Sequence, residues 1–308
     1  MREVDIVAPI HNEDKNIAEF VYRVSKALDE FTEDYRIILI DDGSTDSSWH
    51  AIETEFHNDN KIIGLKLSKN FGHHHAISAG IHKSYANWVI VMDSDLQDRP
   101  EVIPQLYKKA KEGFDVVFVS RENRPESKLY LIMQKTFYLI LRNLSGIQFD
   151  PNQANFSIIS KKVVESFINF SEQSRFYPST IKWLGFTRSY IFADHGTRFS
   201  GAPAYTIRKR FKLAFEIILA FSDRPLKFAI GLGVTFSAIS FLMVGFIVIR
   251  RILFGFSVIG WPSIMATLLF SSGMILVFLG INGMYISKIF AEVKKRPLFV
   301  IQKELTKK

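Results

Sequence analysis

Cysteine is absent from the 308-residue chain. Its absence excludes a disulfide framework, a thiolate metal site and a thiol nucleophile. Internal repeats and low-complexity tracts are also missing, and a hydrophobic content of 47% excludes a disordered or fibrous chain. The run Val4–Pro9 is β-rich and has no basic segment or small-residue cleavage site before it, so we expect no signal peptide and a first domain on the cytosolic side.

Charged residues are missing from two long segments, Phe228–Ile249 and Ser263–Ser287. Each exceeds the roughly 20 helical residues that cross a hydrocarbon core, so we predict two transmembrane helices; two buried core helices are the alternative. The connection between the spans holds Arg250 and Arg251. More basic residues precede the first span and follow the second, at Arg208, Lys209, Arg210, Lys212, Arg224 and Lys227 and at Lys288, Lys294, Lys295 and Arg296. By the positive-inside rule we expect a multi-pass protein of the inner (plasma) membrane with both termini cytoplasmic.

The net charge of +8 is compatible with nucleic acid, an anionic membrane surface or a phosphorylated substrate. Because the basic clusters flank the spans and do not form an aromatic-interleaved soluble face, we expect the membrane bilayer as a partner and no nucleic acid.

The first part of the chain alternates apolar β-branched runs with segments of helical period. Strands are expected near residues 4–9, 35–41, 61–67, 87–92 and 115–119, with helices near 15–31, 46–57, 73–85 and 100–112 between them. This alternation predicts an α/β fold with a doubly wound, mostly parallel sheet. Ligands bind such sheets at the carboxyl ends of the strands, so the residues that follow each strand are the ones to inspect.

Two further segments combine an apolar face with basic residues, at residues 128–142 and 207–221. We interpret them as interfacial helices on the bilayer; core helices that pack on the sheet are the alternative. The predicted organisation is a cytoplasmic domain at 1–205, an interfacial amphipathic helix at 206–225, two transmembrane helices within 226–287 (about 228–249 and 263–287) and a cytoplasmic basic tail at 288–308.

The motif Asp93-Ser94-Asp95-Leu96-Gln97 follows an apolar strand. Its two carboxylates lie two residues apart, so on extended backbone they project to the same side. One or two carboxylates completed by substrate phosphates suit Mg²⁺ or Mn²⁺. Paired acids often only cap a following helix, and we expect Asp98 before Pro100 to have that role. For Asp93 and Asp95, the position at the end of a buried strand favours the metal site.

Polar groups also follow two other strands, in Asp41-Asp42-Gly43-Ser44 and in Pro9-Ile10-His11-Asn12-Glu13. A carboxylate can accept from a nucleobase N–H or a ribose hydroxyl, and a His ring can stack on a base. Helix capping explains Asp46 better than it explains Asp42. The run His73–His75 is expected to begin a helix, because consecutive helical residues point in different directions and do not converge on one ion.

Taken together, these motifs resemble family 2 glycosyltransferases of the GT-A fold. The resemblance rests on Pro9–Glu13, Asp41–Ser44, Ser68–Gly72 and Asp93–Asp98. More narrowly, the chain is similar to polyprenyl-phosphate glycosyltransferases, the group with dolichyl-phosphate mannose synthase and the bacterial GtrB and ArnC types. The run Glu292–Leu298 and the two C-terminal spans match the bacterial members.

This resemblance implies inverting transfer of a sugar from a nucleotide sugar, UDP-linked on family grounds, to polyprenyl (undecaprenyl) phosphate at the cytoplasmic membrane face, in cell envelope glycan biosynthesis. Alternatives are another lipid or glycan acceptor, or a catalytically silent scaffold. The bacterial members also suggest a homo-oligomer. By the resemblance, the metal ligands are Asp93, Asp95 and Gln97, and the nucleotide sugar is bound by Pro9, His11, Glu13, Asp41, Asp42, Asp93, Ser94 and Asp95.

The resemblance likewise implies catalytic roles for Asp95, Arg121, Asn155 and Arg198, and lipid-phosphate binding by Arg121, Arg198, Tyr205 and Arg208. A surface salt bridge is the alternative for each arginine. Asn155 stands where relatives commonly have an acidic residue proposed as a base, and an amide accepts no proton at neutral pH. A phosphate monoester is largely ionised at pH 7, so it is a nucleophile without a base. Pro203-Ala204-Tyr205 lacks a family lysine, whose charge Arg208, Lys209 or Arg210 could replace.

Overall fold

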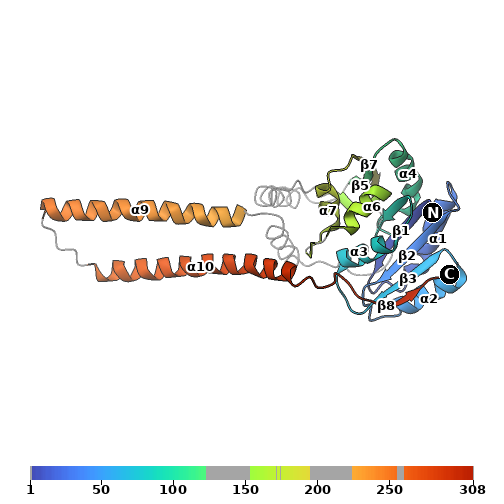
Figure 1. The fold of residues 1–308 in the computed structure, drawn as a ribbon, viewed down its shortest axis with the longest axis horizontal. Coiled ribbons are helices and arrows are strands. Elements are labelled where there is room, and N and C mark those ends of the chain that lie inside the picture. Colours follow the sequence, from blue (N-terminus) through green and yellow to red (C-terminus); the bar gives the residue numbers. More distant parts are fainter. Residues whose placement is uncertain are drawn as a thin grey trace. The chain divides into compact units, whose positions relative to one another are not determined.

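The structure, a computed structural model, describes residues 2–122, 153–170, 172–173, 175–194, 224–254 and 260–307 (Figure 1). The chain divides into two compact units. The first comprises Met1–Leu131, Asp150–Ala204 and Arg296–Lys308, and the second comprises Ile132–Phe149 and Tyr205–Lys295.

An eight-stranded sheet forms the centre of the first unit, in the order β7-β5-β6-β4-β1-β2-β3-β8. Its strands are β1 (Val4–Ile10), β2 (Tyr35–Asp41), β3 (Ile62–Leu67), β4 (Trp88–Val91), β5 (Val116–Glu122), β6 (Gln153–Ser160), β7 (Arg188–Asp194) and β8 (Ile301–Leu305). β6 and β8 pair antiparallel with their neighbours, and the other pairs are parallel. The predicted mostly parallel α/β sheet is therefore confirmed, and all five expected strands are present.

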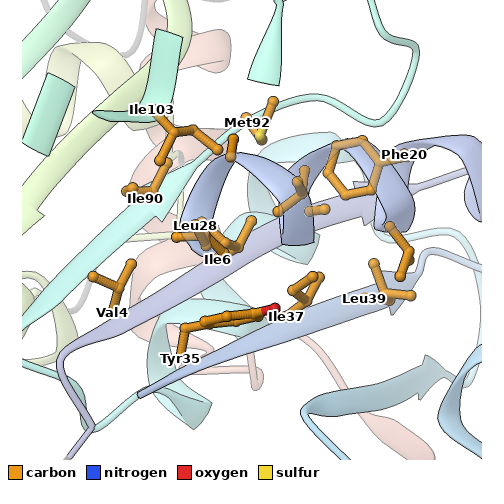
Figure 2. Packing of buried hydrophobic residues seen from close by; sticks show 14 of the residues in the cluster. Val4, Ile6, Phe20, Leu28, Tyr35, Ile37, Leu39, Ile90, Met92 and Ile103 are labelled. Carbon is orange, nitrogen blue, oxygen red and sulfur yellow. The ribbon is translucent and has the colours of Figure 1, made fainter. Parts of the chain in front are cut away.

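Helices cover both faces of this sheet, so central strands such as β1 and β2 are buried on both sides. α1 (Ile17–Asp29), α2 (Ser48–Asn58) and α4 (Ile103–Lys111), which follows the short 3₁₀ helix η1 (Pro100–Val102), contribute to one core cluster. α3 (His73–Lys83), α6 (Lys161–Ile168) and α7 (Tyr177–Trp183) contribute to the other. In β2, Ile37 and Leu39 belong to the first cluster, whereas Ile38 and Ile40 belong to the second. Figure 2 shows the first cluster, with Phe20 and Leu28 of α1 among the strand residues.

α3 lies directly on the sheet because Gly80 has no side chain. A Cβ at Gly80 would meet Val7 Cγ1 at 2.4 Å and Ile40 Cδ1 at 2.7 Å, distances that real Cβ atoms do not show. This close approach holds the helix against β1 and β2, so its position relative to the strand ends is fixed by packing.

β8 comes from the C-terminal segment and adds an edge strand next to β3. Leu305 lies close to Gly64 and packs on the first core cluster, while Lys83–Glu304 and Lys303–Glu53 ion pairs join β8 to α3 and α2. The sequence predicts only a basic tail at 288–308, so this strand was not anticipated. The exposed charges on β8 also suit an edge strand, because they oppose pairing with another sheet.

The second unit contains two long helices, α9 (Arg224–Phe254) and α10 (Trp261–Val293). Both are long and apolar enough to cross a membrane, and each extends beyond the predicted span. Their apolar residues are exposed in the protein, which does not fit the alternative of buried core helices. The predicted interfacial helix at 128–142 lies outside the described residues, as does the one at 206–225 up to residue 223.

We expect removal of residues 300–308 to destabilise the first unit by about 2 kcal/mol, the net value of a few lost backbone hydrogen bonds, and to lower Tm by about 5 °C. The exposed edge of β3 should also make aggregation depend on protein concentration. Thermal unfolding and light scattering measure both effects. Removal of residues 306–308 alone is the matched control, because it leaves β8 intact. Equal Tm values for the two truncated proteins would contradict a stabilising role for β8.

Candidate active site

Polar residues gather where β1, β2 and β4 end, which we call the carboxyl edge. Because β6 runs antiparallel to β4, its beginning lies at the same edge, and the register Val91↔Ser157 brings Asn155 opposite Asp93. In the sheet order β6-β4-β1-β2, the edge carries Asn155, then Asp93–Gln97, then Pro9–Glu13, then Asp41 and Asp42. The structure thus brings together the predicted residues from all of these segments.

Asp42 joins the end of β2 to the loop Ser68–Gly72. Its carboxylate accepts hydrogen bonds from the backbone N–H groups of Phe71 at 2.7 Å and Gly72 at 2.9 Å, and the residue is only 2% exposed. The sequence predicts a contact between Asp42 and the nucleoside, but in this structure the carboxylate supports the loop. Each carboxylate oxygen can accept a second hydrogen bond, so both roles are compatible.

Asp41, the last residue of β2, is fully buried. Its Oδ1 accepts from the backbone N–H of Ser44 at 2.9 Å, whereas its Oδ2 is buried without a hydrogen-bond partner among the described residues. Asp41 therefore shapes the turn after β2. The predicted direct contact between Asp41 and the nucleotide stays a prediction.

Gly43 allows the turn after β2 to pack against the Ser68–Gly72 loop. Its φ is +64°, and a Cβ there would lie 2.4 Å from the backbone nitrogen of Asn70. Both the left-handed backbone and the close approach require glycine.

His11 is exposed, and its ring is held by this turn and loop. Its Nδ1 lies 3.0 Å from the carbonyl oxygen of Asp42, and Asn70 Nδ2 lies 3.3 Å from both ring nitrogens. An exposed planar ring in a fixed position suits the predicted stacking on a base.

Pro9 and Glu13 are tied to neighbouring segments. The Pro9 carbonyl accepts from Ser94 Oγ at 3.2 Å, and the Glu13 carboxylate accepts from Asn16 Nδ2. Ser94 is buried, and its hydrogen bond to Pro9 links β1 to the Asp93–Gln97 turn.

Asp95 and Gln97 form a tight turn after β4. Asp95 Oδ1 accepts from the backbone N–H of Gln97 at 3.1 Å, and Leu96 between them has a φ of +60°. A positive φ costs a leucine about 1–2 kcal/mol, and the burial of its side chain offsets that cost. Asp93, Asp95 and Gln97 are all partly buried.

The donor set fits a metal ion that a substrate completes. Across the described ranges, no group of three or more His, Cys, Asp or Glu side chains is arranged to hold a metal by itself. Two carboxylates and an amide oxygen are nevertheless hard oxygen donors, and Mg²⁺ commonly takes one or two carboxylates together with substrate phosphates.

The three consecutive histidines point to three different places. His73 Nε2 lies 3.2 Å from Asp93 Oδ1 and 3.0 Å from Asn155 Nδ2. His74 is enclosed against Phe176. His75 contacts the carbonyl oxygens of Phe71 at 2.9 Å and Gln173 at 3.2 Å. The prediction that these residues begin a helix and do not share one ion agrees with this geometry.

The protonation of His73 and His74 differs because their surroundings differ. Burial lowers the pKa of His73, but the nearby carboxylates, Asp93 first and then Asp42 and Asp95, together raise the pKa above its ordinary value. Burial lowers the pKa of His74 to about 3, so this ring is neutral at pH 7. Sequence reasoning did not select His73 as a site residue; its position directly after Gly72, at a helix start near the strand ends, is the signal that could have done so.

The structure describes one of the four predicted lipid-phosphate residues, Arg121. Arg198, Tyr205 and Arg208 lie outside the described residues. Arg121 belongs to β5, where its backbone pairs with Ala193 of β7. These assignments stay predictions.

Comparison with known proteins gives matches over the whole chain. The family Glycosyl transferase family 2 matches residues 5–170. The SfII prophage-derived bactoprenol glucosyl transferase of Shigella flexneri is 31% identical over 302 residues, which cover 98% of each chain. The undecaprenyl-phosphate 4-deoxy-4-formamido-L-arabinose transferase of Proteus mirabilis is 28% identical over 306 residues, 98% of this chain and 94% of that one.

The solved structures add the fold. Glucosyl-3-phosphoglycerate synthase from Mycobacterium tuberculosis, in complex with Mn²⁺, uridine diphosphate and phosphoglyceric acid, aligns with a TM-score of 0.50. The alignment covers 71% of this chain and 76% of that chain at 15% identity. At this identity the match shows the GT-A fold alone.

We expect Gly43→Ala to separate the turn after β2 from the Ser68–Gly72 loop. The overpacking should lower the free energy of unfolding by about 1–3 kcal/mol, and amide exchange at Phe71 and Gly72 should speed up as their bonds to Asp42 weaken. Gly185→Ala is the matched control: its φ is +74°, but its Cβ would meet no atom closer than 3.9 Å. If both variants lose the same stability without faster exchange at Phe71 and Gly72, the backbone angle alone explains the need for glycine.

Proposed function

Because the chain belongs to glycosyl transferase family 2, we propose that it transfers a sugar from a nucleotide-sugar donor, UDP-linked, to a polyprenyl phosphate such as undecaprenyl phosphate. An oxygen of the lipid phosphate forms a bond to the anomeric carbon while the bond from that carbon to the nucleoside diphosphate breaks, with inversion. The observation that carries the proposal is the row of polar groups along the carboxyl edge, from Asp42 to Asn155.

The nucleoside end of the donor is assigned to β1 and β2. The exposed His11 ring supplies a stacking surface, and Glu13 and Asp42 supply oxygens that accept hydrogen bonds. The Asp42 bonds to Phe71 and Gly72 hold the Ser68–Gly72 loop beside these groups before any ligand arrives. Such preorganisation lowers the entropic cost of binding.

The diphosphate end is assigned to the turn after β4. Asp93, Asp95 and Gln97 would hold Mg²⁺ or Mn²⁺, which when bound neutralises charge on the leaving nucleoside diphosphate. The buried Leu96 and the bond from Gln97 N–H to Asp95 keep this turn rigid, so the oxygen ligands need little rearrangement.

The acceptor assignment is supported by the relatives and by chemistry. Two relatives that cover nearly the whole chain are named for transfer to bactoprenol or undecaprenyl phosphate. A phosphate monoester is already ionised at pH 7, so the amide at position 155 does not prevent its attack. The names of these two relatives give different sugars but the same class of lipid acceptor. The acceptor class is therefore what the two relatives share.

The proposed membrane topology is supported by β8, which brings the chain back to the first unit after α9 and α10. α9 and α10 lie between two parts of the first unit, and β8 pairs within the same sheet as β1–β3. If both helices span the bilayer, the first unit and the C-terminus lie on the same side. More basic residues flank the outer ends of the two helices than lie in their connection, which supports the cytoplasm as that side.

Purified protein in detergent with undecaprenyl phosphate, Mn²⁺ or Mg²⁺ and a panel of nucleotide sugars should yield a glycolipid one sugar heavier by mass spectrometry. Chelation of the metal should abolish the product, and Asp95→Asn should reduce its rate at least about 100-fold because it loses a charged ligand. Glu101→Gln is the matched control, since Glu101 pairs with Arg23 on the surface. No product from any donor, with nucleotide binding intact, would favour another acceptor or a scaffold.

The absence of native cysteine allows a direct test of topology. A membrane-impermeant maleimide should label Gly260→Cys, which lies at the start of α10, in intact cells. It should label Lys307→Cys, next to β8, only after the membrane is permeabilised. The cysteine-free protein gives the background. Labelling of both variants in intact cells would contradict the proposed orientation.

A further inference from the structure

His75 contacts two backbone carbonyl groups, one with each nitrogen of its ring. Its Nδ1 lies 2.9 Å from the carbonyl oxygen of Phe71, and its Nε2 lies 3.2 Å from the carbonyl oxygen of Gln173. Phe71 belongs to the Ser68–Gly72 loop, whereas Gln173 lies between α6 and α7. The ring therefore joins the loop beside the nucleoside groups to a segment that is distant in the sequence.

The two contacts require a proton on each ring nitrogen. A carbonyl oxygen only accepts hydrogen bonds, and a neutral imidazole carries one N–H group and one acceptor nitrogen. In either neutral tautomer, one ring nitrogen of His75 would turn its lone pair toward a carbonyl oxygen. The protonated ring donates to both Phe71 and Gln173, so the geometry favours the charged form.

The Gln173 side of this bridge is itself held in place. The Gln173 side chain donates to the carbonyl oxygen of Arg296 at 2.9 Å. Arg175, which is 6% exposed, donates to the carbonyl oxygens of two residues that precede it in the same segment. His75 thus ties the Ser68–Gly72 loop to a segment that further hydrogen bonds fix.

The Phe71 side of the bridge leads to the candidate site. The N–H of Phe71 donates to Asp42 at 2.7 Å, while its carbonyl oxygen accepts from His75, so one residue is held from two directions. Asn70 in the same loop contacts the ring of His11, which is assigned to the base. A loop held in this way loses less conformational freedom when a nucleotide binds.

The surroundings of His75 carry both signs of charge. The strands beneath α3 and the packed face of α6 present apolar side chains to the helix. The charged or titratable residues on the segments around His75 are Asp42 and Lys69 on the loop side, His73 and His74 on α3, Tyr177 on α7, and Glu172, Arg175 and Arg296 on the Gln173 side. Imidazole is the ordinary side chain whose charge changes between pH 5 and 8, so a contact that needs its charged form is lost as the pH rises.

We propose that His75 is a positioning residue whose protonated ring holds the Ser68–Gly72 loop in its nucleotide-binding arrangement, so that affinity for the nucleotide sugar falls as the pH rises. This inference rests on the proposed function and specifies how the donor is held. His75 acts through Phe71 and needs no contact with the donor. The bridge is complete at low pH and loses one of its two hydrogen bonds when the ring becomes neutral.

The test measures the dissociation constant of UDP-glucose at pH 6 and pH 8, in the full-length protein in detergent with Mn²⁺. UDP-glucose is the probe because its diphosphate lacks the second ionisation that a phosphate monoester has near pH 6. Between these pH values the dissociation constant of the wild type should rise about 5-fold more than that of His75→Arg, the effect of one lost hydrogen bond. The guanidinium of His75→Arg has several N–H donors and keeps its charge at both pH values.

Two further variants complete the comparison. His75→Ala should bind UDP-glucose about 5-fold more weakly than the wild type at pH 6 and should approach the wild type at pH 8. His50→Ala is the matched control, because the His50 side chain is 84% exposed on α2, and it should keep the pH dependence of the wild type. Other groups that titrate in this range are common to all four proteins, so the differences isolate His75.

Two measurements on the protein without nucleotide give a readout that does not depend on binding. The ¹⁵N shifts of the His75 imidazole, assigned by their absence in His75→Arg, should show protons on both nitrogens at pH 6. At pH 8, amide exchange at Phe71 should be faster in the wild type than in His75→Arg, because the neutral ring holds the loop less firmly. Thermal unfolding of each variant confirms that it is folded.

The outcomes separate this inference from the proposed function. A neutral His75 ring at pH 6, or equal pH dependence of UDP-glucose binding in the wild type and His75→Arg, would overturn the inference. A protein that binds UDP-glucose with the expected pH dependence but transfers no sugar to undecaprenyl phosphate would contradict the proposed function and support the inference. If the wild type binds no nucleotide sugar, the proposed function fails, and the protonation and exchange of the unliganded protein decide whether His75 holds the loop.

Discussion

The carboxylate of Asp42 is the interaction on which the candidate site depends. It accepts from two consecutive backbone N–H groups, at Phe71 and Gly72, and so connects the end of β2 with the beginning of α3. The contact is possible because Gly43 lets the two segments approach and Gly80 lets α3 lie on the sheet. His73 then begins the helix beside Asp93. Three separate segments thereby acquire one fixed arrangement before any ligand binds.

The sheet order converts this arrangement into a line of different charges. Carboxylates lie at the ends of β2 and β4, whereas the beginning of β6 carries an amide beside a His ring. The antiparallel direction of β6 is what brings Asn155 to this edge, since a parallel strand would present its last residues there instead.

The sequence predicts the local features of this structure better than its long-range ones. The sequence predicts features that depend on neighbouring residues or on short spacings. These are the β-branched runs, the Asp93–Gln97 motif and the family resemblance. Three contacts join residues that are 20 to 62 positions apart: the support of the loop by Asp42, the contact between His73 and Asp93, and the pairing of Asn155 opposite Asp93. No local pattern in the sequence indicates which partner each residue has. Asp42 illustrates the difference, since its position at a strand end was evident while its partners were not.

β8 is a second feature that depends on long-range contacts and that the sequence alone does not predict. Its run Ile301–Leu305 has apolar residues only at its two ends, so it resembles a polar tail when it is read alone. Its strand conformation depends on pairing with β3, whose residues lie more than 200 positions earlier. Leu305 also gains a contact beside Gly64 that no neighbour in the tail provides. That pairing also constrains the ways in which α9 and α10 could cross a membrane. A chain that leaves a folded unit and returns to the same sheet must cross a bilayer an even number of times. Two membrane-spanning helices are therefore compatible with the pairing of β8 and β3, whereas one or three such helices are not.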